Sequence, residues 1–128
     1  NVDINKLVQF HKSKNRVATL TAVRPPARFG HLDIYEDEVQ NFGEKNQADE
    51  GWINGGFFVL NREICKYIKS ENEPLETGAL PLLAKAGNLL AYKHFGFWQS
   101  MDTLRDKNNL TLITKNNSEP KLPWFSIQ

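Results

Sequence analysis

Several positions in this sequence carry residue types that can bind or position a phosphorylated ligand. Glu44 and Lys45 are adjacent, so at the end of a strand both side chains can reach the same bound molecule. Lys45 can donate a charge-assisted hydrogen bond to a phosphate, which contributes about 1.5–3 kcal/mol, and Glu44 can accept hydrogen bonds from two sugar hydroxyls. By itself, however, a Glu-Lys dipeptide is usually a solvated ion pair, and both interpretations stay open.

A run of Asn54, Gly55 and Gly56 interrupts the otherwise apolar stretch 52–60. Glycine in a strand forfeits side-chain packing, and it usually marks a bulge or a close approach of another group to the backbone. The pattern therefore indicates either a bulge that only bends the sheet or a ligand that contacts the backbone here. Gly30 carries the same ambiguity.

Asp102 directly precedes Thr103 at the expected start of a helix. The local pattern favours Asp102 as the helix N-cap. A carboxylate at the carboxyl end of a strand is also where an α/β protein binds a hard cation, and Mg²⁺ takes one or two carboxylates together with phosphate oxygens. The histidines at 11, 31 and 94 lack the spacing of metal ligands, so we expect them to serve packing or the surface.

The pattern of apolar residues predicts the elements that must position these side chains. Helical periodicity with Asp3 as the cap predicts a helix over 3–13, and a β-branched apolar run predicts a buried strand over 16–23. Further strands are predicted at 29–35, 39–42, 52–60 and 89–97, and further helices at 61–69, 77–85 and 103–112. The first two strands of that set join through the acidic turn 36–38. A helix followed by a buried strand favours an α/β layer architecture.

Expected helix ends follow from residue type. Asn61 and Thr77 are the expected caps of the second and third helices, and Gly87 ends the third. Near the C-terminus, Trp124 and Phe125 interrupt a polar, proline-bearing stretch, and we expect them to dock as an aromatic anchor.

Length and composition predict one folded domain. The chain has 128 residues, of which 40% are hydrophobic and 24% are charged. Sixteen Lys and Arg residues stand against fifteen Asp and Glu, with no basic run interleaved with aromatics, which argues against a nucleic-acid surface. No apolar run approaches the roughly 20 residues of a membrane span, and the first residues do not resemble a signal peptide. A cytoplasmic protein without a membrane partner is expected.

The single cysteine, Cys65, excludes an internal disulfide and is expected to be packed.

Four segments taken together resemble a known family. RPPARFG, FGEK, EGWINGGFFVL and GFWQSMDTLRDK occur in the order and spacing of sugar-1-phosphate nucleotidyltransferases, over residues 1–114. The tryptophan four residues before the aspartate in WQSMDTLRD is similar to the branch that makes CDP-glucose. The resemblance implies an α/β fold, with a Rossmann-like, glycosyltransferase-A-like mixed sheet that is mainly parallel and flanked by helices. It further implies that this sequence is the second half of that fold, with a small β-rich insertion and with 115–128 as a C-terminal tail.

The resemblance assigns roles to the residues singled out above. Lys45 is implied to hold the sugar phosphate and Glu44 to bind glucose hydroxyls, while Asn54 and Gly30 are implied to line the sugar pocket. These four residues would thus surround the sugar 1-phosphate.

Trp98 is implied to form a wall of the same pocket, and Asp102 is implied to ligate Mg²⁺. Asp102 and Lys45 are the implied catalytic residues. The implied substrates are glucose 1-phosphate and CTP. The sugar phosphate oxygen attacks the α-phosphorus of CTP, so that pyrophosphate leaves and CDP-glucose forms, mainly through positioning and charge neutralisation. The implied pathway is nucleotide-sugar biosynthesis for deoxysugars of cell-surface polysaccharide such as O-antigen. The family forms homo-oligomers, so a homo-oligomer is implied here.

Two departures from the family pattern matter. Asn46 stands where the family usually has proline, which can alter the loop but leaves both functional side chains in place. The family's glycine-rich nucleotide loop and a second metal-binding aspartate would lie before Asn1. We therefore expect this chain alone to be inactive. Transfer from UTP or dTTP is the alternative within the same class, and a non-catalytic sugar-phosphate-binding or assembly fragment is the alternative from another class.

Overall fold

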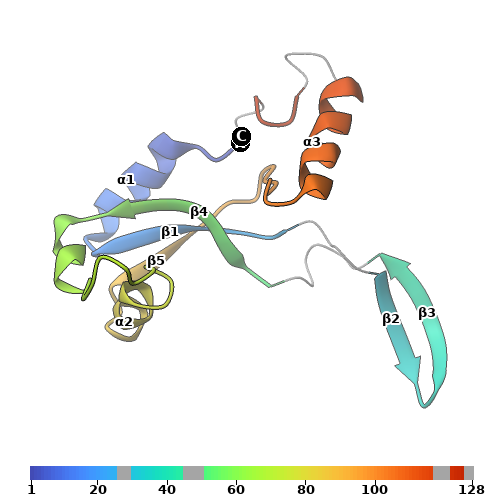
Figure 1. Cartoon of the computed structure of the whole chain (residues 1–128), viewed down its shortest axis with the longest axis horizontal. Helices are drawn as coiled ribbons and strands as arrows, with labels where there is room; N and C mark the ends of the chain where they lie inside the picture. Colours follow the sequence, from blue (N-terminus) through green and yellow to red (C-terminus); the bar gives the residue numbers. More distant parts are fainter. Residues whose placement is uncertain (26–29, 45–50, 117–121, 126–128) are drawn as a thin grey trace. The chain divides into compact units, whose positions relative to one another are not determined.

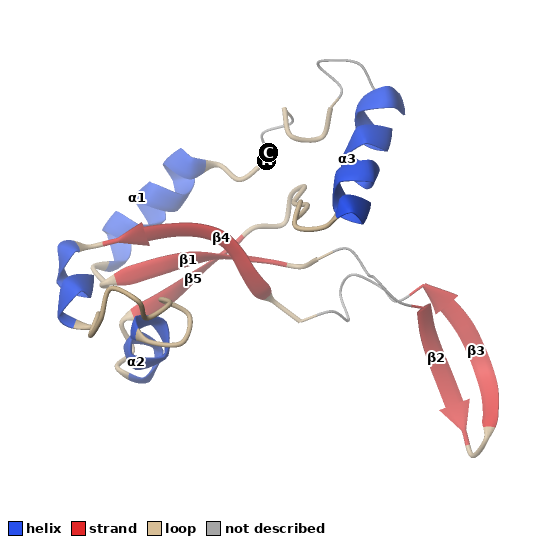
Figure 2. Ribbon diagram, viewed as in Figure 1, coloured by secondary structure: helices blue, strands red, loops and turns tan. Residues whose placement is uncertain are grey.

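The computed structural model describes residues 1–25, 30–44, 51–116 and 122–125, which divide into two units. The sheet unit comprises Val2–Ala22 and Asn54–His94, and the hairpin unit comprises Asn1, Val23–Ile53 and Phe95–Gln128. Helices, strands and loops of both units are coloured in Figure 2.

A three-stranded sheet organises the sheet unit, with strand order β4-β1-β5. The central strand β1 (Ala18–Val23) pairs in parallel with β5 (Leu89–Lys93), in a register that sets Ala18 beside Leu89. On its other side lies β4 (Ile53–Leu60), which runs antiparallel to β1 (Figure 1). The sheet is therefore mixed, with one parallel and one antiparallel pairing. The family resemblance implies a mainly parallel sheet, but within the part that the structure describes the sheet is not mainly parallel.

Helices cover both faces of this sheet. The ring of Phe10, on α1 (Ile4–Lys14), lies 5.5 Å from the ring of Tyr92, so α1 packs on the face to which Tyr92 points. The opposite face bears Ala18, which packs into a buried cluster with residues of α2 (Ala79–Lys85). The expected α/β architecture of a mixed sheet with flanking helices is confirmed.

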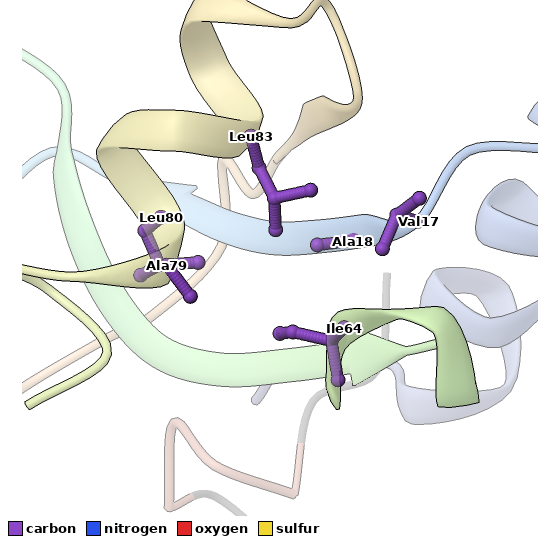
Figure 3. Packing of buried hydrophobic residues seen from close by; sticks show 6 residues of the cluster. All are labelled: Val17, Ala18, Ile64, Ala79, Leu80 and Leu83. Carbon is purple, nitrogen blue, oxygen red and sulfur yellow. The ribbon is translucent and has the colours of Figure 1, made fainter. Parts of the chain in front are cut away.

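The main hydrophobic core lies between α2 and the start of β1 (Figure 3). Leu83 is fully buried at 0% exposure and reaches from α2 toward Ala18 on β1. Ile64 enters the same cluster from a short 3-10 helix, η1 (Arg62–Lys66). The remaining buried members are Val17, Ala79 and Leu80. Close packing of this kind makes a cavity costly, and Leu→Ala in such a core typically costs about 2–5 kcal/mol.

The first helix begins where the sequence predicts it. The Asp3 side chain accepts the backbone N–H of Lys6 at 3.0 Å, which satisfies one of the unpaired donors of the first turn. Asn15 ends the helix in the left-handed conformation, with φ 48°.

An antiparallel hairpin forms the β structure of the hairpin unit. Strands β2 (Gly30–Tyr35) and β3 (Glu38–Glu44) pair around a turn at Glu36 and Asp37, where Glu36 has φ 53°. An irregularity between Asp33 and Ile34 shifts the register. The two strands and the acidic turn predicted from the sequence are confirmed.

The caps of two later helices differ from the predicted ones. Asn61 precedes η1 but makes no side-chain cap bond, because its amide donates to the carbonyl of Arg16 at 2.8 Å. The residue before α2 is Gly78, and the hydroxyl of Thr77 bonds the carbonyl of Pro74 at 3.3 Å. Tertiary contacts and turn geometry thus override the local cap pattern at both sites.

Three further expectations meet mixed outcomes. The strand predicted over 89–97 ends at Lys93. Cys65 is exposed, so the prediction of a packed thiol is wrong. Near the C-terminus, the ring of Trp124 lies 6.1 Å from that of Phe97, which confirms the aromatic anchor for Trp124, whereas Phe125 is 53% exposed. Among the described residues, no helix has the length and apolar character that a membrane span requires.

Candidate functional site

The open end of the hairpin brings two predicted site residues together. Gly30 begins β2 and Glu44 ends β3, and the register makes them direct cross-strand partners. Such partners in an antiparallel pair have Cα atoms only about 4.5–5.5 Å apart. Lys45 lies outside the described residues, directly after Glu44 in the chain. A backbone without a side chain at Gly30 therefore lies beside the strand end that leads to the Glu-Lys pair.

Asn54 organises its own stretch of β4. Its Oδ1 accepts the backbone N–H of Gly56 at 2.9 Å, and Gly56 has φ 83°, a conformation that favours glycine. A Cβ on Gly56 would meet no described atom within 4 Å, so the requirement for glycine is conformational rather than steric. While Oδ1 accepts this bond, the NH₂ group, which is the donor of the Asn54 side chain, can donate to a ligand.

The carboxylate of Asp102 is not used to cap the following helix. The helix is α3 (Leu104–Asn116), and its cap is Thr103, whose hydroxyl accepts the N–H of Asp106 at 3.1 Å. In return, the Asp106 carboxylate accepts the N–H of Thr103 at 3.1 Å. This reciprocal pair is a capping box with aspartate in the glutamate position. The expectation that Asp102 is the cap is wrong, and its exposed carboxylate remains available for another role.

The segment that leads to Asp102 is held by contacts from both ends of the chain. The backbone nitrogen of Asn1 donates to the carbonyl of Phe97 at 2.8 Å, and the ring of Phe97 packs against Trp124. Trp98 follows directly and is half-buried. These contacts fix the backbone on which Trp98 and Asp102 lie.

A divalent metal fits Asp102 only as one ligand among several. Mg²⁺ in phosphate-binding sites keeps water and takes one or two carboxylates along with phosphate oxygens. Over residues 1–25, 30–44, 51–116 and 122–125, no group of three His, Cys, Asp or Glu side chains is placed to hold a metal ion. An exposed carboxylate that caps no helix suits such a site, with substrate phosphates or further residues completing it.

Among the histidines, His11 packs inside the sheet unit, as expected. His11 is buried, with Nδ1 2.8 Å from the Thr19 hydroxyl and Nε2 3.2 Å from the side-chain oxygen of Asn61. The backbone N–H of His94 donates to the carbonyl of Ala22, which extends the pairing of β5 with β1.

The sequence did not predict one cluster of side chains in the hairpin unit. The guanidinium carbon of Arg24 lies 4.8 Å from the ring centre of Trp52, and the ring of Phe95 meets Trp52 edge-on, at 5.4 Å and 85°. From the sequence, Arg24 follows one predicted strand, Trp52 begins another and Phe95 lies within a third, which does not reveal a contact between them. Of the predicted site residues with described positions, Gly30, Glu44, Trp98 and Asp102 belong to this unit. Asn54 belongs to the sheet unit.

The described residues form an α/β fold, and comparison with known families gives the class of the protein. The sequence model of the family described as "Nucleotidyl transferase" matches residues 1–106. The chain therefore belongs to the nucleotidyl transferase family.

Several sugar-1-phosphate nucleotidyltransferases are similar to this chain over nearly its whole length. The chain is 45% identical over 123 residues to a glucose-1-phosphate cytidylyltransferase of Salmonella typhi, which covers 96% of this chain and 48% of that protein. It is 35% identical over 125 residues to a probable glucose-1-phosphate cytidylyltransferase of Bacillus subtilis, at 97% and 48% coverage. A glucose-1-phosphate adenylyltransferase of Clostridium novyi is 31% identical over 140 residues, at 90% and 37% coverage. The chain spans about half the length of the cytidylyltransferases that it matches.

A solved structure supports the fold. A structure from Bacillus anthracis, described as a glucose-1-phosphate thymidylyltransferase in complex with sucrose, aligns with a TM-score of 0.59. The alignment covers 95% of this chain and 53% of that one, at 19% identity. The mixed α/β sheet with flanking helices thus corresponds to part of a sugar nucleotidyltransferase fold.

Proposed function

We propose that the protein carrying this chain transfers CMP from CTP to glucose 1-phosphate, giving CDP-glucose and pyrophosphate, and that this chain supplies its sugar-facing part. The observation that carries the proposal is the 45% identity over 96% of the chain to a glucose-1-phosphate cytidylyltransferase. The adenylyltransferase and guanyltransferase relatives are less similar, at 27–31% identity. The CTP-using branch therefore fits best.

In this proposal the open end of the hairpin receives the sugar 1-phosphate. Lys45 donates to the phosphate, and Glu44 accepts from glucose hydroxyls. Gly30, the cross-strand partner of Glu44, leaves room for the sugar because it has no side chain. Trp98 forms a wall of the pocket. These groups hold the phosphate oxygen in line with the α-phosphorus of CTP, so that the new P–O bond forms as the bond to pyrophosphate breaks. Asn54 keeps its predicted role of binding the sugar, for which its NH₂ group is the donor.

Asp102 would hold Mg²⁺ with one carboxylate ligand. When bound, the ion would neutralise negative charge on the phosphates of both substrates. The role of this chain is to keep the carboxylate exposed, which the capping box of Thr103 and Asp106 makes possible. Product use in nucleotide-sugar supply for cell-surface polysaccharide, a cytoplasmic location and a homo-oligomeric state belong to the same proposal.

Nucleotide competition tests the base specificity. The whole protein is incubated with glucose 1-phosphate, Mg²⁺ and one of CTP, UTP, dTTP or ATP, and the nucleotide sugar and pyrophosphate are measured. We expect the highest kcat/KM with CTP. A higher kcat/KM with UTP or dTTP would leave the family assignment intact and reject the cytidylyl assignment.

We further expect this chain alone to make no CDP-glucose, because Asp102 is a single carboxylate and the sequence contains no glycine-rich phosphate loop. The chain and the whole protein are assayed side by side, with circular dichroism to establish that the chain is folded. Turnover by the folded chain at a rate near that of the whole protein would contradict this expectation. Absence of turnover by the whole protein with any nucleotide would favour a binding or assembly role.

A further inference from the structure

Arg24, Trp52 and Phe95 form a cluster in which Arg24 and Phe95 both contact the tryptophan ring, called the Trp52 cluster below. The guanidinium of Arg24 lies over the ring at 4.8 Å, within the range of a cation–π interaction. The centre of the Phe95 ring lies 5.4 Å from that of Trp52 with an interplanar angle of 85°, the T-shaped arrangement that aromatic pairs prefer. Trp52 is therefore in contact with residues 28 positions before it and 43 positions after it in the chain.

Each member lies next to the end of a strand. Arg24 follows the last residue of β1, and Phe95 stands two positions after the last residue of β5. Trp52 directly precedes the first residue of β4. Because β1 and β5 are parallel, both leave the sheet at the edge formed by their carboxyl ends, and the antiparallel β4 enters there. Ligands of open α/β sheets bind outside this edge.

The Trp52 cluster also brackets the segments that carry the proposed sugar site. Residues 24 and 52 are the two ends of the insertion that contains Gly30, Glu44 and Lys45. Phe95 opens the segment that runs to Trp98 and Asp102. A contact among the three members therefore joins the base of the hairpin insertion to the segment that bears the metal-binding candidate.

We infer that Trp52 is a positioning residue for the sugar 1-phosphate site, acting through the ends of the insertion that bears Glu44 and of the segment that bears Trp98 and Asp102. This inference rests on the proposed function. Loss of the ring would let the segment ends separate, and a displacement of about 1 Å at reacting groups can cost on the order of 100-fold in rate. The effect should fall mainly on the sugar phosphate, because Gly30, Glu44 and Trp98 on these segments are assigned to that substrate, whereas Asp102 acts on both substrates through Mg²⁺.

If the Trp52 cluster has a purely structural role, a substitution in it that leaves the fold stable should not change the kinetics. Phe95 offers such a substitution. Its side chain is 77% exposed, so truncating it removes little buried surface and should leave the melting temperature nearly unchanged. If the Trp52 cluster only stabilises the fold, Phe95→Ala should also leave catalysis unchanged.

The sheet unit offers a matched control of similar chemistry. The amine of Lys14 lies 5.9 Å from the ring centre of Phe10, and that ring packs against Tyr92 at 5.5 Å. Phe10→Leu thus removes an aromatic ring that has one cationic and one aromatic partner, on a helix that bears no proposed site residue.

The experiment compares four variants of the whole protein, Trp52→Leu, Trp52→Phe, Phe95→Ala and Phe10→Leu, with the nucleotide that the wild type uses. We expect Trp52→Leu to lower kcat/KM for glucose 1-phosphate by roughly 10- to 100-fold, with KM for the nucleotide changed by less than about threefold. Trp52→Phe should recover most of the loss because it restores a ring. Phe95→Ala should show a smaller loss in the same direction at an unchanged melting temperature, and Phe10→Leu should keep wild-type kinetics.

Several results would overturn the inference. They are unchanged kinetics in Trp52→Leu, an equal loss for both substrates, or a loss matched by Phe10→Leu. If the wild type turns over no nucleotide, the proposed function fails, and calorimetric binding of glucose 1-phosphate becomes the readout. Weaker binding in Trp52→Leu and Phe95→Ala than in Phe10→Leu then supports the inference, and equal or absent binding in all proteins rejects it.

Discussion

Thr19 and Thr21 lie two residues apart on the same face of β1, and each is 0% exposed. The hydroxyl of Thr19 is hydrogen-bonded to Nδ1 of His11 at 2.8 Å. Over the described residues, the hydroxyl of Thr21 has no hydrogen-bond partner. One strand face therefore carries a satisfied and an unsatisfied buried hydroxyl.

The direction of the bond between Thr19 and His11 follows from the amide of Asn61. That amide donates through its nitrogen to the carbonyl of Arg16 at 2.8 Å, so its oxygen is the atom that faces Nε2 of His11 at 3.2 Å. Nε2 then carries the proton, and in a neutral imidazole Nδ1 accepts from the Thr19 hydroxyl. Thr19 is thus the donor that satisfies a buried acceptor.

Valine substitutions at the two threonines should have opposite effects on stability. Thr19→Val leaves Nδ1 of His11 without its donor, which should lower the free energy of unfolding by about 1–3 kcal/mol. Thr21→Val replaces an unsatisfied hydroxyl with a methyl group of similar volume, which should leave stability unchanged or raise it by up to about 1–3 kcal/mol. Thermal melting of the whole protein with each variant measures the difference. Equal melting temperatures would show that the two hydroxyls are equivalent.

Local signals made parts of the fold predictable from the sequence. The start of α1 depends on a bond from Asp3 to a backbone N–H three residues away, and the hairpin depends on a turn between two β-branched or aromatic runs. The α/β class followed from the same short-range patterns. The candidate site residues were predictable because their order along the chain matches a family, rather than because any one of them is distinctive.

Long-range contacts and neighbouring caps were beyond local reasoning. Asn61 has the residue type of a cap, but its partner His11 lies 50 positions away. Asp102 and Thr103 are both good N-cap residues in adjacent positions, and only the backbone geometry decides between them. The contact between Arg24 and Trp52 likewise depends on how the insertion between them closes.

Asp102→Asn should remove most activity of the whole protein without changing its stability. The side chain is exposed and does not cap α3, so its amide should leave the fold intact. As a poorer Mg²⁺ ligand, it should lower kcat/KM by about 100-fold or more, since metal stabilisation of developing charge is worth several kcal/mol. Steady-state kinetics across a range of Mg²⁺ concentrations, together with thermal melting, check both expectations.

Thr103→Ala is the matched control for Asp102. It removes the hydroxyl of the capping box, which should cost about 0.5–2 kcal/mol of stability, and it should spare most of the activity. Asp102→Asn should therefore lower activity but not stability, and Thr103→Ala should lower stability but spare most of the activity. Retained activity with unchanged Mg²⁺ dependence in Asp102→Asn would show that this carboxylate is not a metal ligand.

Lys45→Ala should weaken the use of glucose 1-phosphate while leaving CTP nearly unaffected. Loss of one charge-assisted phosphate contact of about 1.5–3 kcal/mol corresponds to roughly a 10- to 150-fold fall in kcat/KM. The melting temperature should hardly change, because a surface substitution usually costs within about 0.5 kcal/mol. Kinetics with each substrate varied separately distinguish the two effects.

Lys66→Ala provides the comparison for a lysine with no proposed ligand. Its amine lies 3.9 Å from the carboxylate of Glu63, and its side chain is 76% exposed, so removing it should change neither stability nor kinetics measurably. A contact from Lys45 to the sugar phosphate must act mainly through that substrate, because CTP is held by other groups. Equal weakening for CTP and glucose 1-phosphate, or kinetics in Lys45→Ala that match those of Lys66→Ala, would place Lys45 on the solvated surface. The sugar phosphate would then need a different cation.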